Sequence, residues 1–101
     1  MPSDPRSLAD IDRLIHEPAR LALTAILSVV ESADFLYLQR ETGLTKGNLS
    51  FHLAKLEEAG YVAIEKTYRG RVPLTLVCLT DTGTTAYKAY RARFKKFLEK
   101  T

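Results

Sequence analysis

The order of apolar and polar positions divides the chain into helical stretches and one alternating stretch. Leu49, Leu53 and Leu56 recur at helical spacing and fall on one side of the helical wheel. Thr45 before them suits a helix N-cap, and Gly60 after them suits a helix end. This spacing predicts an amphipathic helix between Thr45 and Gly60. No acidic residue occurs between positions 43 and 56, so the leading half of this helix is small, polar and basic.

Two helices of different character are predicted near the start of the chain. Leu8, Ile11 and Ile15 follow Ser7, a possible N-cap, at i, i+3 and i+7, and predict a short amphipathic helix that ends near His16. The next helix, expected over 18–32, has a proline in its first turn and is apolar nearly all round. A helix with almost no polar face is expected at the centre of the core.

A short break and a third helix precede the amphipathic one. Residues 33–36 predict a break that can hold a strand of two or three residues, and a short helix is expected over 36–42. Phe35 and Leu38 are expected to point inward. Gly43 supplies the backbone conformation for a tight turn, and Leu44 is expected to pack inward beside it.

The period changes from helical to two after position 60. Residues 61–68 and 74–79 alternate as two strands, with Val62 and Ile64 on one face. Arg69-Gly70-Arg71 supplies the turn between them, and Pro73 is expected at a strand start or an edge because it lacks an amide hydrogen. The two strands predict an exposed hairpin with a basic tip.

Composition and charge narrow the class of protein. A chain of 101 residues with 46% hydrophobic and 27% charged residues is expected to form one globular domain over 1–101, with a loose tail at 1–6. Residues 1–42 hold four basic and seven acidic residues, 43–72 hold five and three, and 73–101 hold six and two. The positive charge therefore lies in the middle and at the end of the chain, as an anion-binding surface requires.

Cysteine content and hydropathy indicate a cytoplasmic protein. Cys78 is the single cysteine, which excludes an internal disulfide and fits a reducing compartment, and it is interpreted as a small core residue. No apolar run approaches the length of a membrane span, and the first residues do not resemble a signal peptide. We therefore expect no membrane association.

Three helices, a tight turn before the third and a following hairpin form the winged helix-turn-helix arrangement, an α+β, mainly α fold. Three stretches, spanning 16–83 in order, resemble the ArsR/MarR-like group of winged-helix transcriptional regulators. The first, His16-Glu17-Pro18-Ala19-Arg20-Leu21-Ala22-Leu23, is similar to the Pro-x-Arg-Leu opening of ArsR-type regulators. Residues 42–62 are similar to the recognition-helix block of the group. The last, Leu79-Thr80-Asp81-Thr82-Gly83, resembles the Leu-Thr-x-x-Gly that follows the wing.

The resemblance implies sequence-specific binding of double-stranded DNA by a dimer. The candidate DNA-binding residues on the recognition helix and at its start are Thr45, Lys46, Gly47, Asn48, Ser50, Phe51 and Lys55. Asn48 can pair with an adenine edge, and Lys46 can reach a guanine or a phosphate. Gly47 would let the backbone approach the groove closely. Phe51 either touches a thymine methyl group or packs against the wing, and His52 is interpreted as a half-buried, hydrogen-bonded structural residue.

Basic residues at the hairpin form the second group of candidates. Lys66, Arg69 and Arg71 lie at or near its tip, and a wing would place them on phosphates or in a minor groove. The alternative is solvated charge on a mobile turn, and only the neighbouring recognition helix favours the DNA interpretation.

Metal, cofactor and enzyme functions find little support in the residues. Helix 36–42 and the last helix carry neither cysteine nor histidine, so we predict no metal site and no cofactor. His16, His52 and Cys78 lie on different elements, and no glycine-rich phosphate loop occurs, so we predict that the protein is not an enzyme.

The last helix, capped by Thr80 or Asp81, is the candidate dimerisation element over 84–101. Its aromatic residues are spaced as in a helix that packs on another helix. Together with apolar residues of the first helix they form the predicted dimer interface: Leu8, Ile11, Ile15, Tyr87, Tyr90, Phe94 and Phe97. The alternative is that this helix folds back on its own domain.

We therefore predict a homodimeric transcriptional regulator that acts as a repressor. The alternative is a non-catalytic winged-helix module that binds another protein in a larger assembly, and RNA binding is a third, weaker option because few exposed aromatic residues are available for base stacking. The sequence does not specify a small-molecule effector.

Overall fold

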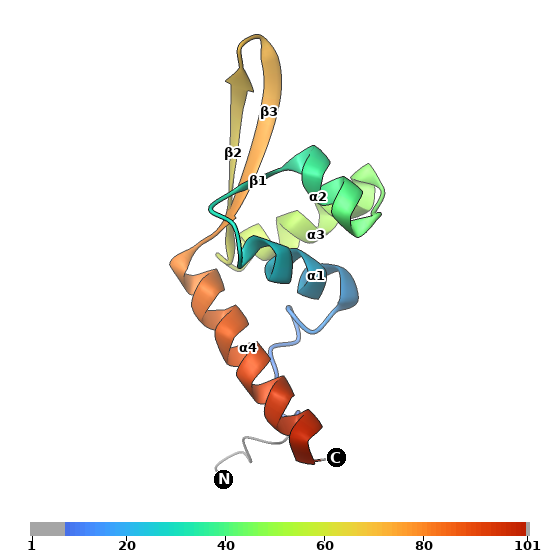
Figure 1. Ribbon diagram of the computed structural model, residues 1–101, viewed down its shortest axis with the longest axis vertical. Helices are drawn as coiled ribbons and strands as arrows, with labels where there is room; N and C mark the ends of the chain where they lie inside the picture. The colour runs from blue at the N-terminus through green and yellow to red at the C-terminus, as the bar shows by residue number, and fades with distance from the viewer. Residues whose placement is uncertain (1–7, 101) are drawn as a thin grey trace.

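The computed structural model describes residues 8–100 and has principal dimensions of 55 × 25 × 21 Å. Its elements are α1 (Pro18–Leu27), β1 (Ala33–Asp34), α2 (Phe35–Thr42), α3 (Lys46–Glu58), β2 (Val62–Arg69), β3 (Val72–Leu79) and α4 (Asp81–Lys100). Figure 1 shows the β2–β3 hairpin projecting from one end of the helical body and α4 from the other. The predicted mainly helical α+β fold with a two-stranded wing is confirmed. The expected tail at 1–6 and the Ser7 cap lie outside the described residues.

The main core lies where α1, α2 and α3 pack against the base of the sheet. Its buried members are Leu23, Leu27, Ala33, Leu38, Leu49, Leu53, Leu56, Val62 and Val77. Phe35 and Leu44 pack against this cluster from the ends of α2, so their predicted inward orientation is confirmed, as is that of Leu38. The three leucines of α3 therefore anchor that helix to the body and leave its opposite side free.

Helix α1 ends at Leu27 and not near Ser32, so the predicted length of the core helix was wrong. The amide of Ser28 donates to the Thr24 carbonyl at 2.9 Å, and the chain then leaves the helix. Val29 and Val30 consequently lie in a loop and are 81% and 38% exposed. Apolar character predicted a helix here, but the chain must turn at this point to deliver β1 to the sheet.

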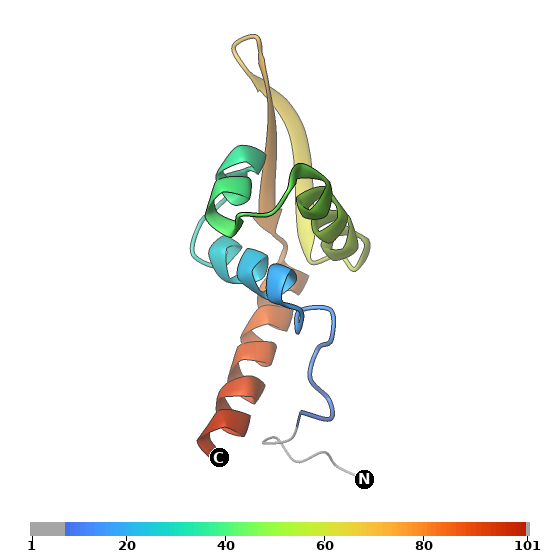
Figure 2. The same cartoon turned by 90° about the vertical axis from the view of Figure 1, so that its right-hand side faces the viewer.

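Residues 8–17, the N-terminal segment, form turns and bends where a helix was predicted. Oδ1 of Asp12 accepts hydrogen bonds from the amides of Leu14 (2.9 Å) and Ile15 (3.2 Å), and these bonds close a tight turn. Ile11 and Ile15 still fall on one side and are buried. Figure 2 shows the segment running beside α4. The helix prediction was wrong because the same apolar spacing also occurs in an irregular segment that packs on a helix.

Caps fix the ends of α2 and α3. The Asp34 carboxylate accepts from the Tyr37 amide at 2.8 Å, so α2 starts at Phe35, one residue before the predicted position. Gly43 ends α2 with φ of 71°, and Thr45 caps α3 by accepting from the Asn48 amide at 3.1 Å. The predicted glycine turn and the predicted Thr45 cap are confirmed.

The sheet is antiparallel in the order β1-β3-β2. Its hairpin is longer than predicted, because β2 extends to Arg69 and β3 begins at Val72, which leaves Gly70 and Arg71 as a two-residue turn. Gly70 has φ of 64°, a conformation that glycine adopts at little cost. Pro73 pairs with Tyr68 well beyond β1, so its missing amide hydrogen faces an open strand edge, as expected.

Helix α4 is fastened at its start and extends away from the body. Oγ1 of Thr80 accepts from the Gly83 amide at 3.0 Å, which makes Thr80 the cap. Gly83 itself packs against the backbone of Tyr61, where an added Cβ would lie 2.0 Å from the carbonyl oxygen. Further along, Tyr90 joins Ile11 and Ile15 in a second buried cluster, and this burial raises the pKa of Tyr90. The N-terminal segment thus holds the first half of α4.

Candidate nucleic-acid interface

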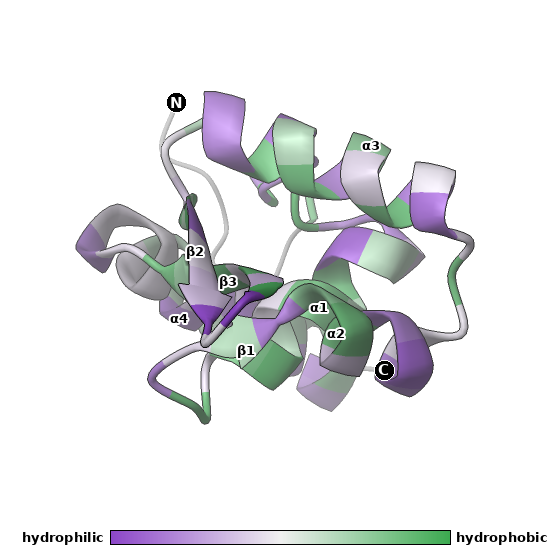
Figure 3. Ribbon diagram, turned by 90° about the horizontal axis from the view of Figure 1, so that it is seen from above, coloured by the Kyte–Doolittle hydropathy of each residue, from purple (hydrophilic) through white to green (hydrophobic). Residues whose placement is uncertain are grey.

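The free side of α3 carries every DNA-contacting residue predicted for that helix. Thr45, the cap, and the six predicted residues within α3 are all exposed, while the leucines on the opposite side are buried. In Figure 3, which looks down on the wing, α3 lies along one edge of the molecule with polar and weakly apolar residues outward. The first turn of α3 itself carries no acidic side chain.

The exposed side of α3 has two parts that face different ways. Lys46 and Ser50 line a groove between α2, α3 and the wing, whose volume is about 880 Å³. Helical geometry places Gly47, Phe51 and Lys55 further round the helix, away from this groove. The first part faces the wing, and the second faces open solvent.

Phe51 and Gly47 have surroundings that favour a partner outside the chain. Phe51 is 54% exposed, and its ring lies against His52, with Nζ of Lys55 5.6 Å from the ring centroid. It is not among the residues that line the groove beside the wing, which argues against the interpretation of Phe51 as a residue packed on the wing. A Cβ added at Gly47 would have no atom within 4 Å, so the fold itself does not require glycine there.

The three basic residues of the wing are exposed but do not form one cluster. Strand register places Lys66 on the same face as Val62 and Ile64, the face toward the helices. Arg69 lies on the opposite face, and Arg71 lies in the turn. The wing therefore presents positive charge on both faces and at its tip.

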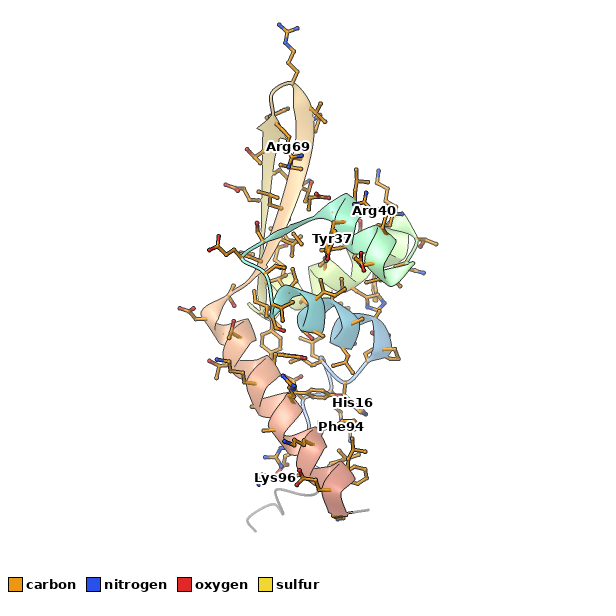
Figure 4. All side chains as sticks on the ribbon, in the orientation of Figure 1. His16, Tyr37, Arg40, Arg69, Phe94 and Lys96 are labelled. Carbon is orange, nitrogen blue, oxygen red and sulfur yellow. The ribbon has the colours of Figure 1, made fainter. Side chains whose placement is uncertain are left out.

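Two exposed residues that the sequence did not single out for duplex DNA lie on α2 and on the wing. Arg40 is exposed on the last turn of α2, and Figure 4 places it with Arg69 in the half of the molecule opposite to Lys96 of α4. Tyr68 is 69% exposed on the helix-facing side of the wing, beyond Lys66. Helix-face position could have suggested Arg40, and the alternation over 61–68 could have suggested Tyr68.

The prediction that His52 is half-buried and hydrogen-bonded is confirmed. His52 is half-buried, and its Nδ1 lies 2.9 Å from Nη1 of Arg20 and 3.8 Å from Oε1 of Glu17. Glu17 is also the cap of α1, accepting from the Arg20 amide at 2.8 Å. The Pro-x-Arg-Leu stretch thus joins the start of α1 to the recognition helix.

The residues predicted for a dimer interface divide into two groups. Ile11, Ile15 and Tyr90 are 7%, 0% and 4% exposed and are buried by this chain itself. Leu8, Tyr87, Phe94 and Phe97 are half-buried and still present part of their surface. His16 connects the N-terminal segment with α4: its Nδ1 lies 2.8 Å from the Tyr90 hydroxyl, and the centroid of its ring lies 5.6 Å from that of Phe94. The first half of α4 therefore folds back on its own domain. Of the residues predicted for the interface, only the half-buried group can contact a partner.

The comparisons with known proteins agree with this geometry. The family model described as "Winged helix DNA-binding domain" matches residues 19–98. The chain belongs to this family. The match runs from α1 through most of α4, so it includes α3, the wing and the aromatic stripe of α4, which consists of Tyr87, Tyr90, Phe94 and Phe97.

Relatives and solved structures support the same assignment. An uncharacterised protein of Methanocaldococcus jannaschii is 38% identical over 77% of this chain and 85% of its own length. The uncharacterised HTH-type transcriptional regulator YcgE of Bacillus subtilis is 34% identical over 74% of this chain, which spans 54% of that protein. The structure of a transcriptional regulator homologue from Pyrococcus horikoshii has a TM-score of 0.83 at 30% identity, covering 88% of each chain.

More distant structures share the fold. A PadR-family transcriptional regulator from Eggerthella lenta covers 87% of this chain and 85% of its own, with a TM-score of 0.67 at 20% identity. An ArsR-family transcriptional regulator covers 100% and 99%, with a TM-score of 0.58 at 23% identity. The relatives whose names state a role are transcriptional regulators.

The remaining chemistry of the described chain is simple. Within residues 8–100, no group of three or more His, Cys, Asp or Glu side chains is placed to hold a metal ion. No helix in that range is long and apolar enough to cross a membrane. Cys78 is half-buried and pairs with Ala63 on the outer face of the sheet, so its interpretation as a core residue was wrong.

Proposed function

We propose that this winged-helix protein is a homodimeric regulator that binds duplex DNA sequence-specifically and represses transcription. One observation carries the proposal: Lys46 and Ser50, in the leading part of α3 that has no acidic residue, and Lys66 of the wing line one shared groove, together with Asp34 and Glu57. A helix with its apolar side anchored and its polar side free can enter a major groove. The wing beside it is placed to hold the adjacent backbone.

Residue roles follow from position on α3 and on the wing. Asn48 offers the paired donor and acceptor that match an adenine edge, and Lys46 offers a donor for a guanine or a phosphate. Thr45, Ser50 and Lys55 supply further polar contacts along the helix. Lys66 and Arg69 lie on opposite faces of the hairpin. A wing inserted edge-on into a minor groove would therefore place one of them against each DNA strand, with Arg71 between them.

The dimer would form through the distal half of α4. Leu98 is 54% exposed there, beside the half-buried Phe94 and Phe97. Two copies packed through this stripe would present two recognition helices to two half-sites. A dimer bound to a site that overlaps a promoter would block transcription, and repression is proposed on this basis. A regulator of this kind would work in the cytoplasm, where the DNA of organisms such as the named relatives lies.

The test is selection of bound duplexes from a random pool, followed by affinity measurement across a salt series. We expect enrichment of an inverted repeat and an affinity that falls steeply with salt. Asn48→Ala should relax the preference at one position of each half-site, by about 1–3 kcal/mol of lost discrimination. Failure to enrich any sequence would contradict the proposal.

Light scattering of the same preparation addresses the second candidate function. The exposed part of the α4 stripe also suits a different protein, as expected of an interaction module. A monomer in solution that binds no duplex would favour that function over the regulator.

A further inference from the structure

The guanidinium of Arg20 joins three parts of the fold. Arg20 lies in the first turns of α1, and its Nε donates to the carbonyl oxygen of Leu14 in the N-terminal segment at 2.6 Å. Its Nη1 lies 2.9 Å from Nδ1 of His52 in the middle of α3. A planar guanidinium with donors in fixed directions is suited to hold two acceptors at once. Arg20 therefore ties the recognition helix to the N-terminal segment.

This contact determines which nitrogen of His52 carries the proton. An arginine side chain only donates hydrogen bonds, so Nδ1 of His52 must accept. The imidazole is then neutral with its proton on Nε2, and the contact with Arg20 fixes the orientation of its ring. The carboxylate of Glu17 accepts the Arg20 amide, and its Oε1 lies 3.8 Å from the same Nδ1, beyond hydrogen-bond distance.

His52 in turn supports the exposed side of α3. The Phe51 and His52 rings meet edge to face, with centroids 5.2 Å apart and an interplanar angle of 76°. Phe51 is the large apolar side chain on the solvent-facing part of α3, and Nζ of Lys55 lies near its ring face. Edge-to-face aromatic pairs and cation–π contacts both depend on ring orientation. Fixing His52 therefore favours one orientation of Phe51 and Lys55.

We propose that Arg20 is a positioning residue for DNA recognition, acting through His52 on Phe51 and Lys55. Arg20 itself lies on α1, behind the DNA-facing side of α3, so its effect passes through these side chains. Without Arg20, Nδ1 of His52 loses its donor, the imidazole can adopt its other tautomer, and Phe51 loses a fixed partner. The proposal rests on the proposed DNA-binding function.

The experiment is a double-mutant cycle on binding to the selected duplex. Arg20→Met keeps the apolar stem and removes the donors, and Phe51→Ala removes the supported ring. We expect each change to weaken binding about tenfold and the double variant to bind no more than about threefold worse than either, because both act on one element. Independent effects that multiply to about a hundredfold would overturn the proposal.

Two control variants separate positioning from charge and from stability. Arg20→Lys keeps the positive charge, but one ammonium cannot occupy the places of both Nε and Nη1, so its binding should fall nearly as far as that of Arg20→Met. Tyr61→Phe removes a 2.6 Å hydrogen bond that also ties the N-terminal segment to the domain, through Asp12. It should leave duplex affinity within about twofold of the parent. Parental affinity in Arg20→Lys, or an equal loss in Tyr61→Phe, would overturn the proposal.

A readout without DNA keeps the two proposals separable. Nitrogen chemical shifts of the His52 ring should show the Nε2-protonated tautomer in the parent protein and a mixture in Arg20→Met. Phe51 should change from one side-chain rotamer to several in the same variant. If the parent binds no duplex, the regulator proposal fails, and these spectra still decide whether Arg20 positions His52 and Phe51. An unchanged His52 ring in Arg20→Met would overturn the inference whatever the DNA result.

Discussion

Gly47 and Gly83 show how differently one residue type is used in this chain. Gly47 lies near the start of α3 with open space where a Cβ would be, whereas Gly83 touches the carbonyl of Tyr61. The fold therefore requires glycine at position 83 and tolerates alanine at position 47. At Gly47 we propose close approach of DNA to the backbone as the reason for glycine; the alternative is simple tolerance of glycine near a helix start.

Gly47→Ala should separate stability from binding. Alanine is a better helix former than glycine, so we expect the free energy of unfolding to rise by about 0.5–1 kcal/mol. Affinity for the selected duplex should fall, because the new methyl group occupies space between the helix and the groove. Denaturant unfolding and duplex titration measure the two effects, and a variant that gains stability without losing affinity would exclude close approach at this position.

Gly83→Ala is the corresponding structural change. The added Cβ would lie 2.0 Å from the Tyr61 carbonyl oxygen, which also accepts the Thr80 amide at 3.0 Å. The start of α4 must then move from the end of the sheet, and we expect a loss of about 3 kcal/mol of stability. Thermal unfolding measures this loss, and an unchanged melting temperature would mean that the helix start is not fixed as described.

Tyr61 provides a pH-dependent test at the same scale. Its hydroxyl donates to Oδ2 of Asp12 at 2.6 Å, and this bond to a carboxylate, aided by burial, raises the pKa of Tyr61 from 10.0 to about 12. The folded state therefore holds the phenol proton more tightly than the unfolded state. The stabilisation is complete below pH 10 and is lost as the pH rises towards 12.

We accordingly expect the parent to lose stability more steeply than Tyr61→Phe between these two pH values. At neutral pH the variant should be about 1–2 kcal/mol less stable, since it lacks a hydrogen bond to a charged acceptor. Denaturant unfolding across the alkaline range measures both effects. Parallel stability curves for the two proteins would show that the bond to Asp12 is not made in solution.

At the scale of elements, α4 changes its environment along its length. Tyr90 is 4% exposed and packs with Ile11 and Ile15, whereas Phe97, two turns further on, is half-buried and lies outside that cluster. The helix begins as part of the domain and ends as a projection from it (Figure 1). The first half of α4 thus packs within the domain, and its second half can contact a partner.

Alanine substitutions should distinguish these halves. Tyr90→Ala removes a buried aromatic side chain and should cost about 3–4 kcal/mol of stability. Phe97→Ala should change the unfolding of the monomer by less than about 1 kcal/mol and raise the dimer dissociation constant about tenfold or more. Analytical ultracentrifugation with unfolding at fixed protein concentration separates the two. A Phe97→Ala variant that dimerises normally would place the interface elsewhere.

At the scale of the whole molecule, the wing and the distal part of α4 lie at opposite ends (Figure 1). DNA held at one end would therefore leave the aromatic stripe at the other end free to pair. Both ends are basic, but only the wing end carries positive residues beside the recognition helix. We therefore expect changes to the basic residues of the wing to alter the salt dependence of DNA binding.

Arg69→Ala and Arg71→Ala should each lower the slope of log affinity against log salt concentration by about 1, with affinity falling for all sequences alike. Asn48→Ala should leave that slope unchanged while altering sequence preference. Titrations of specific and random duplexes at several salt concentrations measure both quantities. If all three variants weakened binding uniformly, the division between wing and recognition helix would be wrong.

The sequence alone determined the local features of this fold. Apolar spacing located α3, and alternation located the hairpin. Gly43 indicated the turn before α3, and Thr45 indicated its N-cap. These features depend on residues close together in the chain, since caps, turns and periodicity are local interactions. The exposed side of α3 was predictable for the same reason, because helical geometry fixes which residues oppose the buried leucines.

The tertiary structure decided what depends on distant partners. Asp12 and Tyr61 hold the N-terminal segment as a strap, α1 ends early to deliver β1 to the sheet, and strand register sets Lys66 and Arg69 on opposite faces. The contact of Arg20 with His52 joins residues 32 positions apart, which no local pattern encodes. Periodicity shows which side of an element is apolar; packing of the whole chain decides what that side meets.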